Sequence, residues 1–391
     1  MAEFVSTCVA HRVAHQTMLL SYGQHANGRP ARLAAFGWTG EQRCRGNIAR
    51  VLRISRSVCG RGAASGRDGR SPRDLMLACL DPKAFARGSR CTGTMGGMSL
   101  EADVVARVRR YYDALGEDEW TRLTKNVRGR VSLEIHRRFL RRFVTSGAQV
   151  LEVGAGPGRF TLELAALGAR VVVTDVSEVQ LALNEAHLRG TDAEHHVEGR
   201  ELLDVCDTSR YADGAFDAVV AFGGPLSYAF ERTDEAMRGL LRVVAPNGMV
   251  VASVMSLLGA WRYLLPAITD LDEIVGETAA DMTMRTGDLR HVVDDPSAHI
   301  CQMFRWSDVQ ALLQRAGGRP VGASASNWAS LGDTQALARL ESDAARWERF
   351  LEYEVRACAQ PGVLDGGTHI LFAATAKAPS EKNVAPGLNL P

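Results

Sequence analysis

A glycine-rich segment that follows a short apolar run constrains the fold of this chain more than any other feature. Residues 150–153 are Val-Leu-Glu-Val and predict a buried strand, and glycines follow at positions 154, 156 and 158. Residues 160–167 are largely apolar and predict the first turns of a helix. A strand, a glycine-rich turn and a helix N-terminus together form a pocket in which the backbone closely approaches a nucleotide-like ligand.

The glycine spacing excludes two other nucleotide-binding motifs. The dinucleotide fingerprint Gly-x-Gly-x-x-Gly needs a glycine at position 159, where this chain has Arg159. A phosphate-binding P-loop needs Gly-Lys followed by Ser or Thr, and this loop lacks that sequence.

A carboxylate follows the second predicted strand. Residues 171–174 are a β-branched run that ends at Asp175, 21 positions after Gly154. At the carboxyl end of a strand that lies parallel to the first, this carboxylate can accept hydrogen bonds from both hydroxyls of a ribose. The alternative is an aspartate that only forms the turn after the strand.

Further segments follow in a regular order. Asp204 lies 12 positions before Phe216, the start of a predicted strand at 216–222, and the sequence Gly-Gly-Pro-Leu follows that strand. Residues 240–254 predict a helix end, a turn and a fifth strand, and residues 306–318 predict a helix that begins at Ser307 as its N-cap. Alternating strands and helices predict a doubly wound, mostly parallel sheet.

Together these segments resemble the class I S-adenosylmethionine-dependent methyltransferases, and in particular the small-molecule enzymes of the methyltransferase type 11 kind. The glycine-rich loop is similar to motif I of that family, and residues 242–251 (RVVAPNGMVV) are similar to its turn before strand five. The resemblance extends from about residue 111 to about residue 376. It implies that S-adenosyl-L-methionine is the cofactor.

The resemblance also implies roles for individual residues. Asp175 would bind the ribose, and Asp204 would bind the adenine amino group, with Asp207 as the competing choice. The expected cofactor-binding residues are Glu152, Gly154, Ala155, Gly156, Gly158, Asp175, Val176, Asp204, Val205 and Phe222.

The expected fold is α/β, with a Rossmann-like, doubly wound sheet of seven mostly parallel strands. The expected domain organisation is an Arg-rich leader at 1–98, a methyltransferase domain at 99–378 and a C-terminal tail at 379–391. A cap is expected at about 257–304, inserted between strands five and six. Residues 327–367 form a second expected insert, with a helix at about 338–358.

Charge separates the leader from the rest of the chain. Residues 1–98 hold fifteen basic and five acidic residues, whereas the remainder holds 31 basic and 40 acidic residues. The leader is typical of a disordered segment, of translated sequence upstream of a true start at Met95 or Met98, or of an organelle transit peptide. The acidic remainder does not favour a polyanionic partner, so we do not expect nucleic acid as the substrate.

Several other sites are not expected. Five of the eight cysteines fall in residues 1–98 at irregular spacing without a Cys-x-x-Cys pair, so no metal site is predicted. The longest apolar stretch, residues 248–261, is too short to span a membrane. These features favour a cytoplasmic protein, with organelle targeting by the leader as the alternative. They leave the oligomeric state open.

The acceptor site is expected to use two segments. Tyr112 and Trp120 lie in a predicted helical lid before motif I, and in similar methyltransferases such a segment folds over the cofactor. The cap contributes aromatic residues, methionines and the histidines His291 and His299. His299, His291 and Tyr112 are the catalytic candidates, because a histidine can take a proton from an acceptor hydroxyl.

The predicted function is in-line transfer of a methyl group from S-adenosylmethionine to an oxygen, nitrogen or carbon atom of a small molecule. The sulfonium is already an activated donor, so the protein mainly aligns the reactants and excludes water. The alternatives are an RNA methyltransferase and a non-catalytic protein that binds S-adenosylmethionine or acts as a scaffold.

Overall fold

The computed structural model of this chain describes residues 100–268, 276–292 and 297–376. By their internal contacts, all the described residues belong to one unit. The leader predicted at 1–98 and the tail predicted at 379–391 lie outside the described residues. Within the described ranges, no helix has both the length and the apolarity that crossing a bilayer requires.

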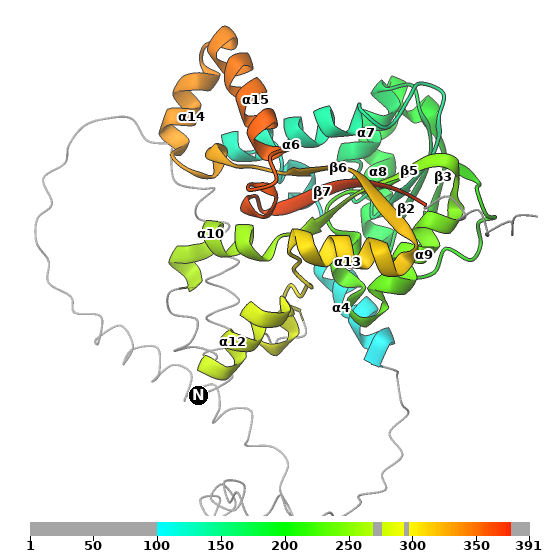
Figure 1. The fold of residues 1–391 in the computed structure, drawn as a ribbon. Coiled ribbons are helices and arrows are strands. Elements are labelled where there is room, and N and C mark those ends of the chain that lie inside the picture. Colours follow the sequence, from blue (N-terminus) through cyan, green and yellow to red (C-terminus); the bar gives the residue numbers. More distant parts are fainter. Residues whose placement is uncertain (1–99, 269–275, 293–296, 377–391) are drawn as a thin grey trace, which may run out of the picture. The chain divides into compact units, whose positions relative to one another are not determined.

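A sheet of seven strands forms the centre of the domain (Figure 1). Its order is β3-β2-β1-β4-β5-β7-β6, the four pairs from β3 to β5 are parallel, and β7 pairs antiparallel with both β5 and β6. The predicted Rossmann-like, mostly parallel seven-strand sheet is therefore confirmed. The strands are β1 (Gln149–Val153), β2 (Arg170–Asp175), β3 (Val197–Leu202), β4 (Phe216–Ala221), β5 (Val244–Met255), β6 (Gly318–Ala325) and β7 (His369–Ala376).

Helices cover both faces of the sheet, and each face has its own apolar core. On one face, Met237 and Leu240 of α9 and Leu312 of α13 are fully buried against the strands. On the other face, Phe139 of α6 and Leu164 of α7 are buried in the same way. These helices are α6 (Val127–Leu140), α7 (Arg159–Ala166), α8 (Glu178–Leu188), α9 (Thr233–Val243) and α13 (Trp306–Ala316). Because strands β1, β2 and β4 are covered on both sides, their residues form near-continuous apolar runs.

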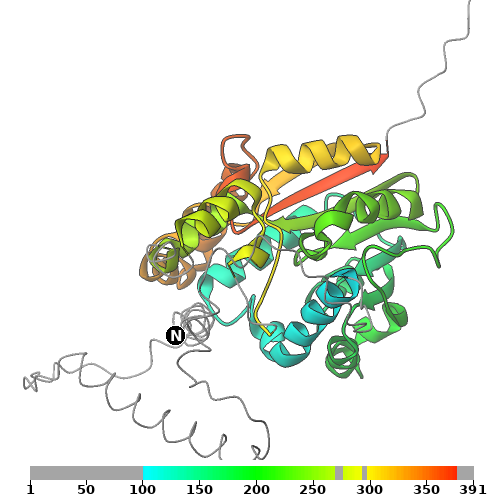
Figure 2. The same ribbon diagram turned by 90° about the horizontal axis from the view of Figure 1, so that it is seen from below.

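Two helices precede the sheet, α4 (Leu100–Leu115) and the short α5 (Asp118–Thr121). In Figure 2, α4 lies beside α8 and away from the end of the sheet formed by β7 and β6. The lid predicted before motif I is therefore attached to the half of the sheet that carries the glycine-rich loop.

The connection between β5 and β6 holds the predicted cap. The described helices of the cap are α10 (Leu257–Ile268) and α12 (Glu277–Thr286), and a 3₁₀ turn at Leu289–His291 follows them. Asp288 pairs with Gln302, and Ser256 pairs with Phe304, so the returning segment is fixed beside the end of β5.

Two sequence predictions about helix boundaries were wrong. Helix α13 begins one residue before Ser307, because the Asp308 carboxylate accepts a hydrogen bond from the backbone N–H of Arg305 and makes Arg305 the N-cap. The single helix predicted at 338–358 is two helices, α14 (Thr334–Glu341) and α15 (Ala344–Cys358). The Asp343 side chain caps α15 by accepting from the Arg346 N–H, and this cap separates the two.

Candidate functional site

The glycine-rich loop leaves the end of β1 with three left-handed glycines. Gly154, Gly156 and Gly158 have φ angles of +68°, +54° and +100°, which only glycine adopts without strain. A Cβ atom on Gly154 would lie 2.5 Å from the ring of Pro225, and one on Gly158 would lie 2.9 Å from Asn184. The first glycine therefore permits close packing against the segment after β4, and the third permits close packing of α7 against α8.

Asp175 closes the loop from the end of the neighbouring strand. Its Oδ2 accepts a hydrogen bond of 2.8 Å from the Gly156 N–H, and its Oδ1 accepts one of 2.9 Å from the Ser177 N–H. The residue is 6% exposed, and burial raises the pKa of its carboxyl to about 6, although these backbone donors favour the ionised form. A carboxylate oxygen can accept more than one hydrogen bond, and Asp175 lines the pocket.

The two acidic candidates after β3 differ in position. Asp204 lines the pocket, where its Oδ1 accepts from the Cys206 N–H at 3.0 Å and its Oδ2 is 3.3 Å from Arg232 Nη1. Asp207 is exposed and accepts from the Ser209 N–H. The geometry therefore favours Asp204 as the residue that faces a ligand, and Asp207 as a residue that stabilises the turn.

Over this loop, α4 is fixed by hydrogen bonds with α8 and its N-cap, and α5 is fixed by the stacking of Trp120. The Ser177 hydroxyl donates to Asp113 at 2.5 Å, and the Gln180 amide donates to the Tyr112 carbonyl oxygen at 2.7 Å. Trp120 of α5 lies between the guanidinium of Arg159, 3.7 Å from the ring centroid, and the ring of His187, 4.0 Å away. The lid thus contacts the same two helices that begin after the glycine-rich loop and after Asp175.

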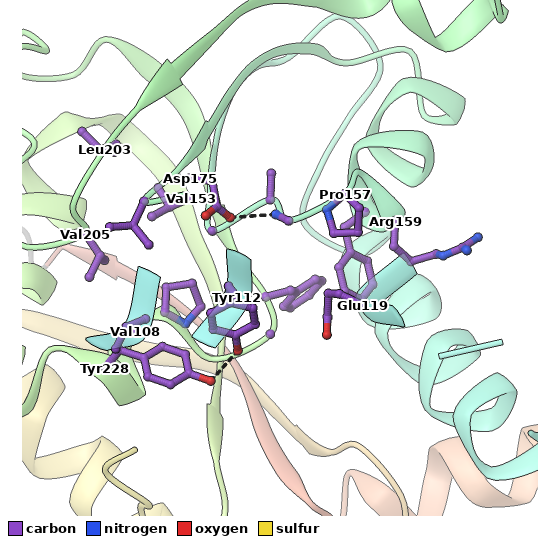
Figure 3. A pocket seen from close by; sticks show the side chains of 18 of the residues that line it. Val108, Tyr112, Glu119, Val153, Pro157, Arg159, Asp175, Leu203, Val205 and Tyr228 are labelled. Carbon is purple, nitrogen blue, oxygen red and sulfur yellow. Dashed lines mark hydrogen bonds between the residues drawn. The ribbon is translucent and has the colours of Figure 1, made fainter. Parts of the chain in front are cut away.

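These elements enclose a pocket of about 940 Å³, part of it open to solvent (Figure 3). It extends from Asp175 and the segment after β3 at one end to Tyr112 and Tyr228 at the other.

Most of the predicted cofactor-binding residues line this pocket. Those on its wall are Gly154, Ala155, Gly156, Asp175, Val176, Asp204, Val205 and Phe222, together with the catalytic candidate Tyr112. Glu152 and Gly158 are not among the lining residues.

Glu152 points away from the pocket, into the interface between β1 and α7. Its Oε2 accepts a hydrogen bond of 2.7 Å from the Thr161 hydroxyl, which in turn accepts from the Asn184 amide at 2.9 Å. Arg200 Nε then donates to the Asn184 side-chain oxygen. Burial raises the pKa of Glu152 to about 8. The geometry favours a role in holding β1, α7 and α8 together.

The two histidine candidates of the cap lie at different places. His299 is outside the wall of the main pocket, and its Nε2 is 2.9 Å from the hydroxyl of Tyr228, which does line it. His291 ends the 3₁₀ turn of the cap, and its side chain lies outside the described residues.

Two lining features were not assigned from the sequence. Arg122 and Glu119 come from the lid, and Arg122 Nε donates to both carboxylate oxygens of Glu119 at 2.8 Å. Tyr228 comes from a 3₁₀ turn at Pro225–Tyr228, directly after the Gly-Gly pair that follows β4. The Glu-x-x-Arg spacing and the tyrosine after Gly-Gly-Pro are the signals that could have indicated them.

Comparisons with known proteins agree with this geometry. A profile of the methyltransferase domain family matches residues 150–248. A demethylmenaquinone methyltransferase of Clavibacter sepedonicus is 34% identical over 27% of this chain and 40% of its own length. A magnesium-protoporphyrin O-methyltransferase of Rhodobacter capsulatus is 30% identical over 32% of this chain and 59% of its own. The chain thus spans about half the length of these relatives.

Solved structures give further matches at low identity. A 1,6-didemethyltoxoflavin-N1-methyltransferase of Burkholderia thailandensis, with bound S-adenosylhomocysteine, is 14% identical with a TM-score of 0.41. That match covers 73% of this chain and 94% of the other.

The strand order, the glycine-rich loop and the family match define a class I S-adenosylmethionine-dependent methyltransferase domain. S-adenosylmethionine is the cofactor of this class. The residues present fit that group, because the glycines leave backbone exposed beside the carboxylates of Asp175 and Asp204 at neighbouring strand ends.

The first prediction concerns Gly154. Gly154→Ala should lower both the free energy of unfolding and the affinity for S-adenosylhomocysteine, because the new methyl group would overlap Pro225. Gly190→Ala is the matched control, since Gly190 has a similar φ of +75° and no atom within 4 Å of the added Cβ. Thermal unfolding and calorimetry should show the larger loss for Gly154→Ala. Equal losses would mean that φ strain alone matters at position 154.

The second prediction concerns the pH dependence of cofactor affinity. Because the pKa of Asp175 is raised to about 6, a ribose that binds its ionised form should bind with constant affinity above that pH. Below it the affinity should fall by up to about tenfold per pH unit. Asp175→Asn should weaken binding by roughly 1.5–3 kcal/mol and flatten this profile. An unchanged profile in Asp175→Asn, measured by calorimetry from pH 5 to 8, would remove Asp175 from the ribose site.

Proposed function

We propose that this protein transfers a methyl group from S-adenosylmethionine to a small-molecule acceptor. The observation that carries the proposal is one continuous pocket that joins the glycine-rich loop and Asp175 to a second region lined by Tyr112, Phe222 and Tyr228. A cofactor held at the first region would direct its methyl group toward the second.

We assign the parts of the cofactor by the chemistry of the wall. Asp175 would accept from the ribose hydroxyls, and Asp204 would accept from the adenine amino group between the apolar side chains of Val176 and Val205. The methionine portion would lie along Gly154 and Gly156, where backbone can approach closely. Phe222 and Pro225 would then flank the sulfonium.

Arg122 is the group that we assign to the methionine carboxylate. Its Nε is occupied by Glu119, but within the described ranges no hydrogen bond involves its two terminal nitrogens. The side chain is 37% exposed and lines the pocket. An arginine fork that is already oriented by a second carboxylate can bind a ligand carboxylate with little loss of side-chain entropy.

The chemistry then needs little from the protein beyond alignment. The cofactor supplies an activated methyl group on a positively charged sulfur. The apolar wall and the lid exclude water, and the residues after β4 restrict the approach of the acceptor to a line with the carbon–sulfur bond. Tyr112 is the polar side chain that we place nearest the acceptor.

A small molecule suits this site better than RNA does. The pocket is covered by α4 and α5, and the relatives described above are named for demethylmenaquinone and magnesium-protoporphyrin. Two arginines of α6 also form ion pairs within the protein. Arg137 bonds to Glu163, and Arg138 bonds to Glu134 and Glu348. These pairs reduce the charge available to phosphates.

Labelled S-adenosylmethionine tests the proposal directly. The purified chain would be incubated with panels of hydroxylated and amino small molecules and, separately, with total RNA. Transfer of label to a small molecule is the expected result. Label in RNA alone would replace the small-molecule assignment, and tight cofactor binding without transfer to any panel would favour a non-catalytic role.

The third prediction separates the carboxylate site from the nucleoside site. Arg122→Met should weaken S-adenosylhomocysteine binding by roughly 10- to 100-fold, the range for hydrogen bonds to a charged group. Binding of 5′-methylthioadenosine, which has the nucleoside but lacks the carboxylate, should change by less than about threefold, because its contacts are unaltered. Calorimetry with both ligands gives the comparison. A similar loss for both would show that Arg122 only supports the lid.

A further inference from the structure

Three side chains from three separate segments form a hydrogen-bonded chain at the acceptor end of the pocket. The hydroxyl oxygens of Tyr112 and Tyr228 are 2.5 Å apart, and the Tyr228 hydroxyl is 2.9 Å from His299 Nε2 (Figure 3 shows the two tyrosines). Tyr112 belongs to the lid, Tyr228 to the turn after β4, and His299 to the returning segment of the cap. This series of hydrogen bonds therefore exists only when the three segments are assembled.

The direction of each hydrogen bond in this series is defined when His299 is neutral with its lone pair on Nε2. The Tyr228 hydroxyl then donates to Nε2, so the Tyr228 oxygen accepts from the Tyr112 hydroxyl. Tyr112 has then used its only proton, and its oxygen retains lone pairs at a residue that lines the pocket. Such an end can accept a hydrogen bond from an acceptor molecule.

The surroundings of His299 favour the neutral imidazole. Burial together with the charges of Arg122 and Arg107 lowers its pKa to about 4. The ring of Tyr111 lies 4.9 Å from the imidazole ring. The titratable and charged groups that face His299 or the two tyrosines from the lid, the turn after β4, the cap and β7 include Arg107, Tyr111, Arg122, Cys301 and His369.

We propose that Tyr112, Tyr228 and His299 form a proton relay and that the acceptor is a molecule methylated on a hydroxyl oxygen. Tyr112 would touch the acceptor, whereas Tyr228 and His299 would act through it as positioning and proton-accepting residues. This inference rests on the proposed function.

The step balances in atoms, electrons and charge. The acceptor oxygen forms a bond to the methyl carbon, and the carbon–sulfur bond breaks with its electron pair remaining on sulfur. The hydroxyl proton passes to the Tyr112 oxygen, the Tyr112 proton to Tyr228, and the Tyr228 proton to His299 Nε2. One positive charge disappears at sulfur and one appears on the imidazole, so the net charge of the site is unchanged.

The strength of the final base distinguishes oxygen from nitrogen acceptors. A protonated ether is a far stronger acid than imidazolium, so the relay can remove the proton as the carbon–oxygen bond forms. A protonated alkylamine is a weaker acid than imidazolium, even at the ordinary histidine pKa of about 6.5. This relay would therefore give little help to an amine, which can instead release its proton to water after product leaves.

The experiment compares Tyr228→Phe, His299→Gln and the control Tyr211→Phe. Tyr211 donates its hydroxyl to Glu201 at 2.8 Å and does not line the pocket, so this control also removes one hydrogen-bonded hydroxyl. His299→Gln can still accept a hydrogen bond but cannot take up a proton at neutral pH. The probes are phenol and 4-nitrophenol as hydroxyl acceptors and benzylamine as the amine, with labelled S-adenosylmethionine.

The relay predicts a specific pattern of rates. Tyr228→Phe and His299→Gln should each lower kcat with phenol by about 10²-fold, and the double variant should be little slower than either single variant. The loss should be much smaller with 4-nitrophenol, which ionises near neutral pH, and should shrink with phenol as the pH rises. S-adenosylhomocysteine affinity should stay within about threefold of that of the parent chain, and Tyr211→Phe should match the parent.

Other outcomes overturn the relay and leave the proposed function standing. These are transfer to benzylamine but to neither phenol, or equal losses with phenol and 4-nitrophenol in both variants. If neither phenol reacts, calorimetry measures whether phenol binds to the S-adenosylhomocysteine complex. Failure of phenol to bind rejects the relay. Failure of the parent chain to bind S-adenosylhomocysteine at all would instead reject the proposed function.

Discussion

The parallel pairing of β1 with β2 is the constraint on which the site depends. Val153 pairs with Thr174, so both strands end at the same edge of the sheet. The glycine-rich loop and Asp175 then meet there, and the Gly156 N–H donates to the Asp175 carboxylate. A shift of one residue in this register would separate the donor from the acceptor and turn Asp175 to the other face of the sheet.

The groups behind the loop hold this junction in place. Glu152, Thr161 and Asn184 form a buried series of hydrogen bonds that continues to Arg200, and it joins β1, α7, α8 and β3. Burying polar groups is unfavourable unless each one finds a partner. This network fixes the junction from behind the loop, whereas the lid above it is held by hydrogen bonds to α8 and its N-cap and by apolar packing of α4.

The residues predicted for the donor half of the site lie together at one edge of the sheet, because that half is local. Gly154 and Asp175 are 21 positions apart, and a strand–turn–helix–strand unit of that length places them at one edge by geometry alone. Glu152 was predicted to bind the cofactor, and that prediction did not include the direction in which its side chain points. Alternate residues of a strand face opposite sides, and only the packed structure shows that Glu152 faces Thr161.

The acceptor half could not be predicted in the same way, because its contacts are long-range. Tyr228 is 116 positions from Tyr112 and 71 positions from His299, so no local pattern relates these residues. Trp120 is a second example of a position that long-range contacts determine. It was expected near the acceptor with Tyr112, yet it packs between Arg159 and His187, because the lid turns between α4 and α5.

A crystal structure of the S-adenosylhomocysteine complex is the most direct test of the central claim, that the β1–β2 junction holds the ribose of this cofactor. We expect both ribose hydroxyls within hydrogen-bond distance of the Asp175 carboxylate, and the homocysteine portion along Gly154 and Gly156. A ligand bound at another edge of the sheet, or a ribose that makes no contact with Asp175, would contradict this account.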